Sequence, residues 1–597
     1  MLRRANLLLA ALFWAGGAAA GEMADSELAR APSAERVTAL QTEAAQKGWA
    51  AVAAQLRAAA MRLYEQHGAQ AQAWYDLYRW ADLFGQTEHQ AVSRWVDAIR
   101  QAQAGHANMP TELRVTERPL GMLAPPELQA YVMGSQDFSD QFFTLLSPLD
   151  QPAMAISILA ELWRRNPAEF KDYASLAIAL AVVYDVPPPP DWPHGQVSAQ
   201  ALSRSLVPPP EIFGFLIKSD RAGALLQPLR KLPASELKYV VDTSVGFDEM
   251  LWAQRKVNVP LAALGKIYDI IRYRRDRIEA GALVWPQTSY RLPAILQAGG
   301  ICVDQAYFAA MVGKAKGVPT LIFRGAGLDG RHAWFGFLDG SGHWQLDCGR
   351  YADQKLVAGF AFDPQMWTNI SDHELMFLSE GFRRLPLFKT SLIHRQFAEV
   401  YFNGGDFAAA AKAARAAINI ERRNLEAWDV LLAAQERMGA PPRQVEGTLQ
   451  EAALAFQRYA DVEADFKNRL VRSLRGRGET SAADFLERSM ARKYEASRED
   501  LSVQQAHDIL GRSMEKDDVN GSIRTYYTVL NSLGHGAGIG FFDQVVRPFI
   551  EHLLKNGKPG EALQAVKQAR QTLRVEPNAQ LDRELSALTD RVQAAVR

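Results

Sequence analysis

A recurring pattern of glycines and small residues in the C-terminal third restricts the fold of this chain more than any other feature. Gly405 and Gly439 lie 34 residues apart, and Gly557 stands in the same local context. Alanines follow the first and the last of these glycines at helical spacing: Ala410, Ala417, Ala562 and Ala569. A fixed period of this size is typical of stacked helical hairpins, because one hairpin cannot bury its apolar face alone.

These periodic residues resemble the tetratricopeptide repeat. The second half of one unit matches Gly405 and Phe407, and the first half of the next matches Trp428, Leu431 and Gly439. Within the helical pattern of residues 27–99, the same spacing recurs at Ala73, Trp74, Leu77 and Gly85. The resemblance implies a concave surface that binds a peptide or a protein partner. The alternative, that these helices only form a packing shell for the rest of the chain, stays open.

The length of the chain requires several domains. At 597 residues it is too long for one hydrophobic core, which stops growing at about 250 residues, and 48% hydrophobic residues are typical of a globular protein. We predict a mostly α-helical fold with a central α+β domain and helical repeats on both sides. The predicted boundaries are 1–20 (signal peptide), 21–110 (helical, repeat-like), 111–235 (helical, with proline-rich connectors), 236–390 (central α+β domain) and 391–597 (helical repeats).

Two proline clusters, at residues 187–190 and 208–210, delimit a segment that cannot be regular helix. We expect an extended connector that lies over the surface and is held by burial of Trp192. His194, two residues later, is interpreted as a structural or a solvated histidine.

The N-terminus has the pattern of a secretory signal. Arg3 and Arg4 precede the apolar residues 7–14, and the alanines at 18–20 form a plausible cleavage site. The alternative is an uncleaved anchor, although the apolar stretch is short for a membrane span. The best later stretch, residues 174–184, has the length of a buried helix. We therefore predict an exported protein of the periplasm with no membrane span after cleavage.

The charge balance argues against nucleic-acid binding. Lys and Arg number 67, as do Asp and Glu, and no long block is basic. The densest basic run, residues 272–277, is interpreted as one solvated face of a helix because Ile271 and Ile278 flank it.

The residues around Cys302 suggest a reactive thiol. Gly299 and Gly300 precede it, and the proline-free run from Cys302 ends before Gly317 and Pro319, a typical helix stop. Cys302 should therefore begin a helix. The positive end of the helix dipole favours thiolate there, which makes the sulfur a better nucleophile.

A small antiparallel sheet is predicted directly after this helix. Residues 320–323, 333–338 and 343–346 have strand patterns, and residues 339–342 form a hairpin turn. Small residues on the face that carries Cys302 suggest close packing against the sheet: Ala306, Ala309 and Gly313. His332 and Asp347 would then lie near the same end of the hairpin.

Four short motifs in this order resemble the transglutaminase-like, papain-related superfamily. They are Cys302 after glycines, Gly317-Val318-Pro319, His332-Ala333-Trp334 and Trp344-Gln345-Leu346-Asp347. The resemblance covers about 100 residues and implies Cys302 as nucleophile, His332 as general base and acid, and Asp347 as the carboxylate that orients the imidazole. The family often continues Asp-Pro, whereas Cys348 follows here, so the exit loop of the last strand is expected to differ.

Oxyanion stabilisation is less clear from the sequence. The backbone N–H of Cys302 is one expected donor, and Tyr290 or Gln297 is the candidate for a second. Trp334, beside the expected base, is either a core residue or a wall of the substrate site.

Two rival interpretations use the same residues. Zinc binding would take Cys302, His332, His343 and Cys348, but their spacing is unlike that of structural zinc sites, so no metal or cofactor is predicted. A disulfide between Cys302 and Cys348 would suit an oxidising compartment, but a strand would turn Cys348 away from Cys302. A buried structural thiol is the third possibility for Cys348.

Two functions fit these observations. The first is an exported thiol enzyme that forms a thioester on Cys302 with an amide of a peptide or protein substrate and transfers the acyl group to water or an amine. Hydrolysis is favoured, because cross-linking requires a site that excludes water. The alternative is a non-catalytic scaffold or binding protein of the cell envelope, in which the helical repeats bind the partner.

Overall fold

The structure of the chain is a computed structural model that describes residues 23–102 (except 24 and 29), 115–204, 206–495, 497–516, 518–535 and 537–596. The predicted signal peptide and the boundary predicted at residue 110 lie outside these residues.

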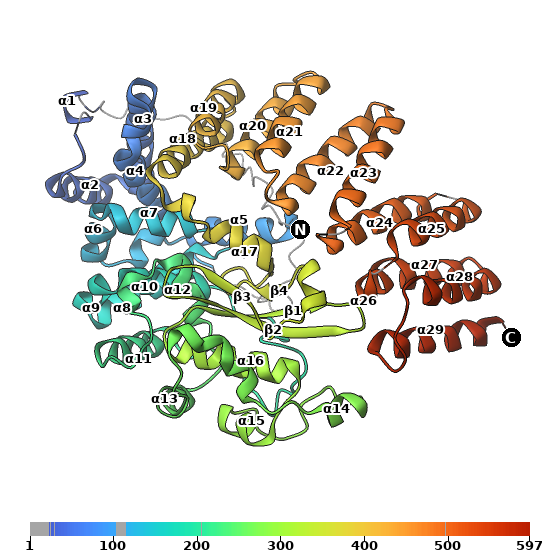
Figure 1. The fold of residues 1–597 in the computed structure, drawn as a ribbon. Helices are drawn as coiled ribbons and strands as arrows, with labels where there is room; N and C mark the ends of the chain where they lie inside the picture. Colours follow the sequence, from blue (N-terminus) through green and yellow to red (C-terminus); the bar gives the residue numbers. More distant parts are fainter. Residues whose placement is uncertain are drawn as a thin grey trace.

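Helices surround one small sheet and continue as an arc of helical hairpins (Figure 1). The N-terminal helices are α2 (Ala34–Lys47), α3 (Trp49–His67), α4 (Gln72–Gly85), α5 (Glu88–Gln101), α6 (Pro126–Gly134), α7 (Gln136–Leu145), α8 (Pro152–Arg165), α9 (Pro167–Asp172), α10 (Ala174–Val183) and α11 (Pro209–Arg221). The central region adds α12 (Ala234–Val241), α13 (Phe247–Lys256), the 3-10 segment η4 (Leu261–Ile270), α14 (Arg275–Glu279), α15 (Leu292–Ala298), α16 (Cys302–Ala315) and α17 (Asp372–Ser379). One hydrophobic core connects the N-terminal helices to α16.

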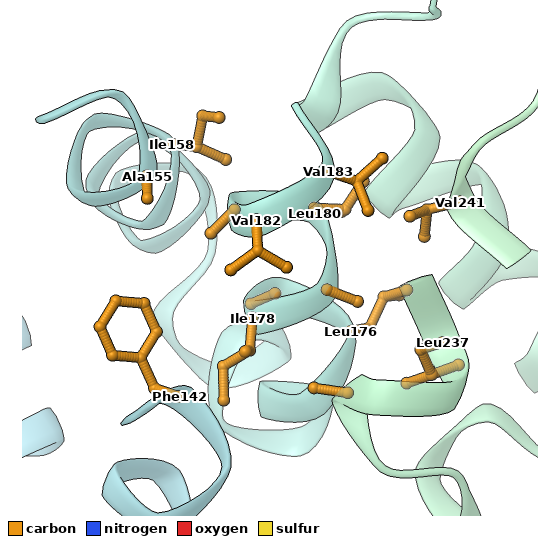
Figure 2. Close-up of a cluster of buried hydrophobic side chains, with 14 of the residues drawn as sticks. Phe142, Ala155, Ile158, Leu176, Ile178, Leu180, Val182, Val183, Leu237 and Val241 are labelled. Carbon is orange, nitrogen blue, oxygen red and sulfur yellow. The ribbon is translucent and has the colours of Figure 1, made fainter. Parts of the chain in front are cut away.

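Helix α10 lies at the centre of the N-terminal half. Its residues from Leu176 to Val183 are buried on every side, by Phe142 of α7, Ile158 of α8 and Leu237 of α12 among others (Figure 2). A helix that is apolar all round belongs either in a core or in a membrane. Its packing confirms the prediction of a buried helix, and none of the described helices is long and apolar enough to cross a membrane.

Shortening Leu180 in α10 should destabilise the N-terminal half. Leu180 is fully buried, so Leu180→Ala leaves a cavity and should cost about 3 kcal/mol of unfolding free energy. Hydrogen exchange of α10 during urea titration measures this loss. The control is Met154→Ala on α8, whose side chain is 44% exposed. Equal losses in the two variants would contradict the burial of α10.

The segment between α10 and α11 has no helix or strand among its described residues, as the proline clusters predict. Trp192 is 3% exposed and makes an edge contact with Trp367, whose ring centroid lies 5.4 Å away. The connector is therefore held as expected. Of the two interpretations of His194, the structural one is confirmed, since the residue is 1% exposed.

The sheet has five antiparallel strands in the order β3-β2-β1-β4-β5. The strands are β1 (Thr320–Ala326), β2 (Arg331–Leu338), β3 (Trp344–Cys348), β4 (Phe360–Phe362) and β5 (Asn369–Ser371). The first three confirm the predicted strands, whereas β4 and β5 were not predicted. Helix α16 packs on one face, and residues of α12 and α17 cover the other. A Cβ at Gly313 would lie 2.4 Å from the Thr320 side chain, so the predicted close approach of α16 is confirmed.

The C-terminal region is a series of helical hairpins, which confirms the predicted helical repeats. Its helices are α18 (Pro386–Asn403), α19 (Phe407–Ile420), α20 (Leu425–Arg437), α21 (Pro442–Ala455), α22 (Ala460–Gly476), α23 (Thr480–Tyr494), α24 (Glu499–Met514), α25 (Val519–Leu533), α26 (Gly538–Phe541), a π-helical turn (Phe542–Val546), α27 (Arg547–Lys555), α28 (Pro559–Thr572) and α29 (Gln580–Val596). Glycines with positive φ end the first helix of four hairpins: Gly405, Gly439, Gly478 and Gly557. The 34-residue spacing of Gly405 and Gly439 is thus the spacing of two such left-handed turns, whereas Gly478 follows Gly439 by 39 residues.

The first helix of this array is joined to the N-terminal helices. The ring of Tyr64 on α3 stacks on Phe397 of α18 at 4.0 Å between centroids, and its hydroxyl lies 2.7 Å from Nδ1 of His394. Helices α3 and α18, which are far apart in sequence, therefore lie side by side (Figure 1).

Candidate thiol site

Cys302 is the first residue of α16, as predicted, and its side chain is partly exposed. Gly299 turns the chain into the helix with φ +76°. Asp304, in the first turn, accepts the backbone N–H of Ile301 at 2.8 Å and so caps the helix. Cys302 therefore lies at a fixed helix end and keeps part of its surface exposed.

Asp304 is the centre of a buried polar network that fixes this helix end. Its carboxylate accepts hydrogen bonds from Arg277 at 2.7 Å and from the Tyr290 hydroxyl at 2.8 Å. The same hydroxyl lies 2.9 Å from Nε2 of His194. Tyr290 is 1% exposed, and both of these contacts occupy its hydroxyl. The structure therefore contradicts Tyr290 as an oxyanion donor, because its hydroxyl holds the helix cap rather than facing a substrate.

The basic run at residues 272–277 was interpreted wrongly as one face of a helix. Tyr273 pairs with Gly300 in a parallel bridge, and the N–H of Arg274 donates to the Gly300 carbonyl at 2.9 Å. The short α14 begins inside the run, at Arg275, and Arg277 within it is 5% exposed. The run lies beside the glycines that precede the thiol, so it is part of the site.

The structure brings Cys302 and the start of β2 together. The backbone N–H of Ala333, the residue after His332, interacts with the Cys302 sulfur and lowers its pKa, as does the N–H of Val303. Burial has the larger effect, and the pKa of the Cys302 thiol is raised above its ordinary value. The expectation that the helix end alone favours thiolate was therefore wrong, because desolvation outweighs the N–H groups.

Several neighbours hold the imidazole of His332, including the Trp334 ring at 6.2 Å between centroids. Its Nε2 lies 2.7 Å from the carbonyl oxygen of Gly349 and 3.5 Å from the hydroxyl of Tyr268. The ring of Tyr351 stacks on it at 4.2 Å between centroids. A carbonyl only accepts, so Nε2 carries the proton and Nδ1 carries the lone pair of the neutral ring. The Tyr268 hydroxyl donates to the Ala333 carbonyl at 2.8 Å, which also ties Tyr268 to β2.

The contacts of Asp347 are with two cations, whereas Nε2 of the His332 imidazole contacts the Gly349 carbonyl. Its carboxylate, 46% exposed, pairs with Arg350 at 2.9 Å and with Lys355 at 3.6 Å. The cause is a β-bulge: Phe337 pairs with Gln345 but Phe335 pairs with Cys348, so Leu346 and Asp347 together face Gly336. The extra residue shifts the register of the strand by one position, and Nε2 of His332 contacts the Gly349 carbonyl.

The other two candidates are Trp334, whose ring lies next to His332, and Gln297. Trp334 is fully buried in the core on the far face of the sheet, with the Arg350 guanidinium 4.5 Å above its ring. It is therefore a core residue and not a substrate wall. Gln297 lies on α15 with an exposed side chain, and its role as an oxyanion donor stays a prediction.

Cys348 is a free thiol, and so is Cys302. The Cys348 sulfur packs next to Gly265, and burial raises its pKa to about 12, with a smaller effect of the Asp347 charge. The structural interpretation of this residue fits these contacts. Across the described residues, no group of three or more His, Cys, Asp or Glu side chains is arranged to hold a metal ion.

Three tyrosines of the site were not identified from the sequence. Tyr268 and Tyr351 contact His332. Tyr273 lies near Cys302. Burial is the larger cause that raises the Tyr273 pKa to about 12, and the charge of Cys302 is the next cause. Tyr273 is 40% exposed and Tyr351 is 53% exposed, so both can meet a ligand. The sequence held two signals for these tyrosines. Tyr273 lies inside the basic run, and Tyr351 lies in the exit loop that differs from the family pattern.

These observations define a class of protein: a mostly α-helical chain in which helical hairpins flank a small antiparallel sheet and a cysteine-bearing helix. No family model and no curated protein matches the sequence.

The solved structures that are similar to the chain include the following two. One is the TPR domain of P58(IPK), with 13% identity over 73% of this chain and 98% of that chain and a TM-score of 0.15. The other is the APC/C hetero-tetramer Cut9–Hcn1, with 12% identity over 94% of this chain and 97% of that chain and a TM-score of 0.19. Such TM-scores are too low for structural inference, so the helical repeats rest on the hairpins themselves.

Proposed function

We propose that the chain is an exported, periplasmic thiol enzyme with a transglutaminase-like core that cleaves or transfers an amide of a peptide or protein. The observation that carries this proposal is the meeting of a largely buried sulfur, on a residue that keeps part of its surface exposed, with the strand that bears a fixed imidazole. Cys302 contacts the N–H of Ala333, and the neighbouring His332 is held through Nε2 with its lone pair on Nδ1.

The reaction follows from these groups. The Cys302 sulfur attacks the amide carbonyl carbon while His332 takes the thiol proton. The C–N bond then breaks, the amine leaves with that proton, and the acyl group remains on sulfur as a thioester. Water, activated by the same imidazole, attacks the thioester, which releases the acid and restores the thiol. The backbone N–H of Cys302 is the expected donor to the oxyanion.

The raised pKa of the thiol gives His332 a specific task. A cysteine that is already a thiolate needs no base to remove its proton. A buried thiol with a raised pKa keeps its proton at neutral pH, so a base must take that proton during attack. The reactivity of Cys302 should therefore depend strongly on His332.

Covalent labelling tests the proposal. In a Cys348→Ala background, Cys302 is the sole cysteine of the chain, which has two. Iodoacetamide should alkylate it at neutral pH at least about 100 times faster than it alkylates the same chain with His332→Ala, because a general base contributes on this scale. Mass spectrometry of the Cys302 peptide gives both rates. Equal rates would refute the enzyme and leave Cys302 as an ordinary thiol.

A second candidate is a scaffold or binding protein of the cell envelope. The specific observation in its favour is the contact of Nε2 with a carbonyl in place of a carboxylate, which orients the imidazole without stabilising an imidazolium as a full charge would. In that case the hairpins α18–α29 bind the protein partner. Equal labelling in the two chains above, together with retention of a peptide partner by a Cys302→Ala chain, would support this candidate.

A further inference from the structure

The last helices of the chain hold the hairpin that presents His332. Residues 327–330 join β1 to β2 and contact α26 and the start of α29. The N–H of Ile539 donates to the Gly327 carbonyl at 3.2 Å, and the N–H of Leu581 donates to the Asp329 carbonyl at 3.0 Å. The turn next to the site is thus bonded through its backbone to helices more than two hundred residues further along the chain.

Arg331, the residue before His332, makes the strongest of these contacts. Its guanidinium donates to both carboxylate oxygens of Asp543 at 2.8 Å and also contacts Glu584. Its backbone N–H donates to the Gln580 side chain at 3.0 Å. Toward Glu584 the two terminal guanidinium nitrogens each donate to a different carboxylate oxygen, and this forked contact fixes direction as well as distance, so the start of β2 has a defined position against the array.

A second arginine completes the cluster. Arg547 of α27 lies 3.0 Å from Asp543 of the π-helical turn and also pairs with Glu584 of α29. Two cations and two carboxylates therefore balance, and three elements of the array share them. The cluster joins α27, α29 and β2 without leaving a net charge, and a change in any one of these elements would move Arg331.

We propose that Arg331 is a positioning residue for His332, and that helices α26–α29 set the geometry of the thiol site through it. This inference rests on the proposed function. His332 is fixed on one side by the Gly349 carbonyl, and the next residue, Ala333, contacts the Cys302 sulfur. Arg331 supplies the fixed point on the other side, so its release allows the imidazole to move relative to the sulfur.

The size of the effect follows from the sensitivity of such pairs to geometry. A displacement of about 1 Å between reacting groups can cost up to about a hundredfold in rate. Release of one end of a strand that stays bonded along its length should cost less. We expect a 5- to 10-fold loss of Cys302 alkylation, on the order of 1 kcal/mol in the barrier.

The test uses the full chain in the Cys348→Ala background. Arg331→Gln should alkylate 5- to 10-fold more slowly than the parent, and its rate against pH should shift toward the profile of His332→Ala. Arg331→Lys, which keeps the charge, should recover most of the rate. The matched control is Arg591→Gln, which breaks the Arg591–Glu551 pair (3.1 Å) inside the array without touching the hairpin, and it should behave as the parent.

A rate and pH profile for Arg331→Gln that equal those of the parent would overturn the inference. Hydrogen exchange of α16 reports whether the variant is folded; if it is not, Asp543→Asn releases the same contact from the array and decides the question by the same two readouts. The proposed function fails separately, when the parent and His332→Ala label equally. In that case faster hydrogen exchange at residues 327–332 in Arg331→Gln than in Arg591→Gln supports the anchoring of the hairpin, and equal exchange refutes it.

Discussion

Arg277→Met should lower the free energy of unfolding of the central region by about 3–5 kcal/mol, because it leaves a buried carboxylate without its cation. The Arg277 and Asp304 side chains are 5% and 1% exposed, and their atoms lie 2.7 Å apart. Burial already raises the pKa of Asp304, against the opposing effect of Arg277. Hydrogen exchange of α16 under urea measures the loss.

The neighbouring Arg274 provides a matched control. It pairs with the exposed Asp276 in the same short segment, so Arg274→Met should cost far less. A double variant, Arg277→Met with Asp304→Leu, should recover part of the stability, since it removes both buried charges. If Arg277→Met proved no more harmful than Arg274→Met, the buried pair would not be what holds the helix cap.

Acidification should destabilise the fold through His194, by about 4–5 kcal/mol between pH 6.5 and pH 3. Burial, with smaller effects of Arg204 and Arg324, lowers its pKa to about 3. Between pH 6.5 and pH 3, His194 is therefore protonated in the unfolded chain and neutral in the folded chain. The stability is complete above pH 6.5 and falls by about 1.4 kcal/mol for each pH unit until the folded pKa is reached.

The hydrogen bonds of His194 explain why the folded protein does not add a second proton to its ring. Nδ1 accepts the N–H of Gln196 at 3.3 Å, so Nε2 carries the proton and donates to Tyr290, whose hydroxyl donates to Asp304. A second proton, on Nδ1, would face the Gln196 N–H.

Urea unfolding at pH 7, 6, 5 and 4 measures this pH dependence. In His194→Gln, the slope of the unfolding free energy against pH should decrease at pH 5 by about 1.4 kcal/mol per pH unit, the contribution of one proton. His535→Gln, a change at an exposed position, is the control. An unchanged slope in His194→Gln would show that other groups cause the acid sensitivity.

Much of the local structure around the thiol could be predicted. Gly317 and Pro319 end α16 as expected, and the turn at 339–342 forms between β2 and β3, where Asp339 accepts the His343 N–H. These elements are determined by residues that are close together in the sequence. Glycine, proline and the alternation of apolar with polar residues therefore predict them. The three-residue strands β4 and β5 are too short to show such a pattern.

The arrangement of the site could not be predicted to the same extent. Its register depends on the bulge at Leu346 and Asp347, which alternation along one strand does not reveal. The pairing of Tyr273 with Gly300 is a long-range contact, and helical spacing around it was misleading. The catalytic roles of Cys302 and His332 stay predictions, and so does the export of the chain.

The anchoring of the β1–β2 hairpin by α26–α29 has a consequence for biosynthesis. Arg331 meets partners that follow it by 212 and 253 positions. Since a chain grows from its N-terminus, the sulfur and the imidazole emerge from the ribosome well before the helices that complete their surroundings. A nascent chain therefore carries an immature site, and the thiol reaches its final reactivity only after the last hairpins have folded onto the sheet.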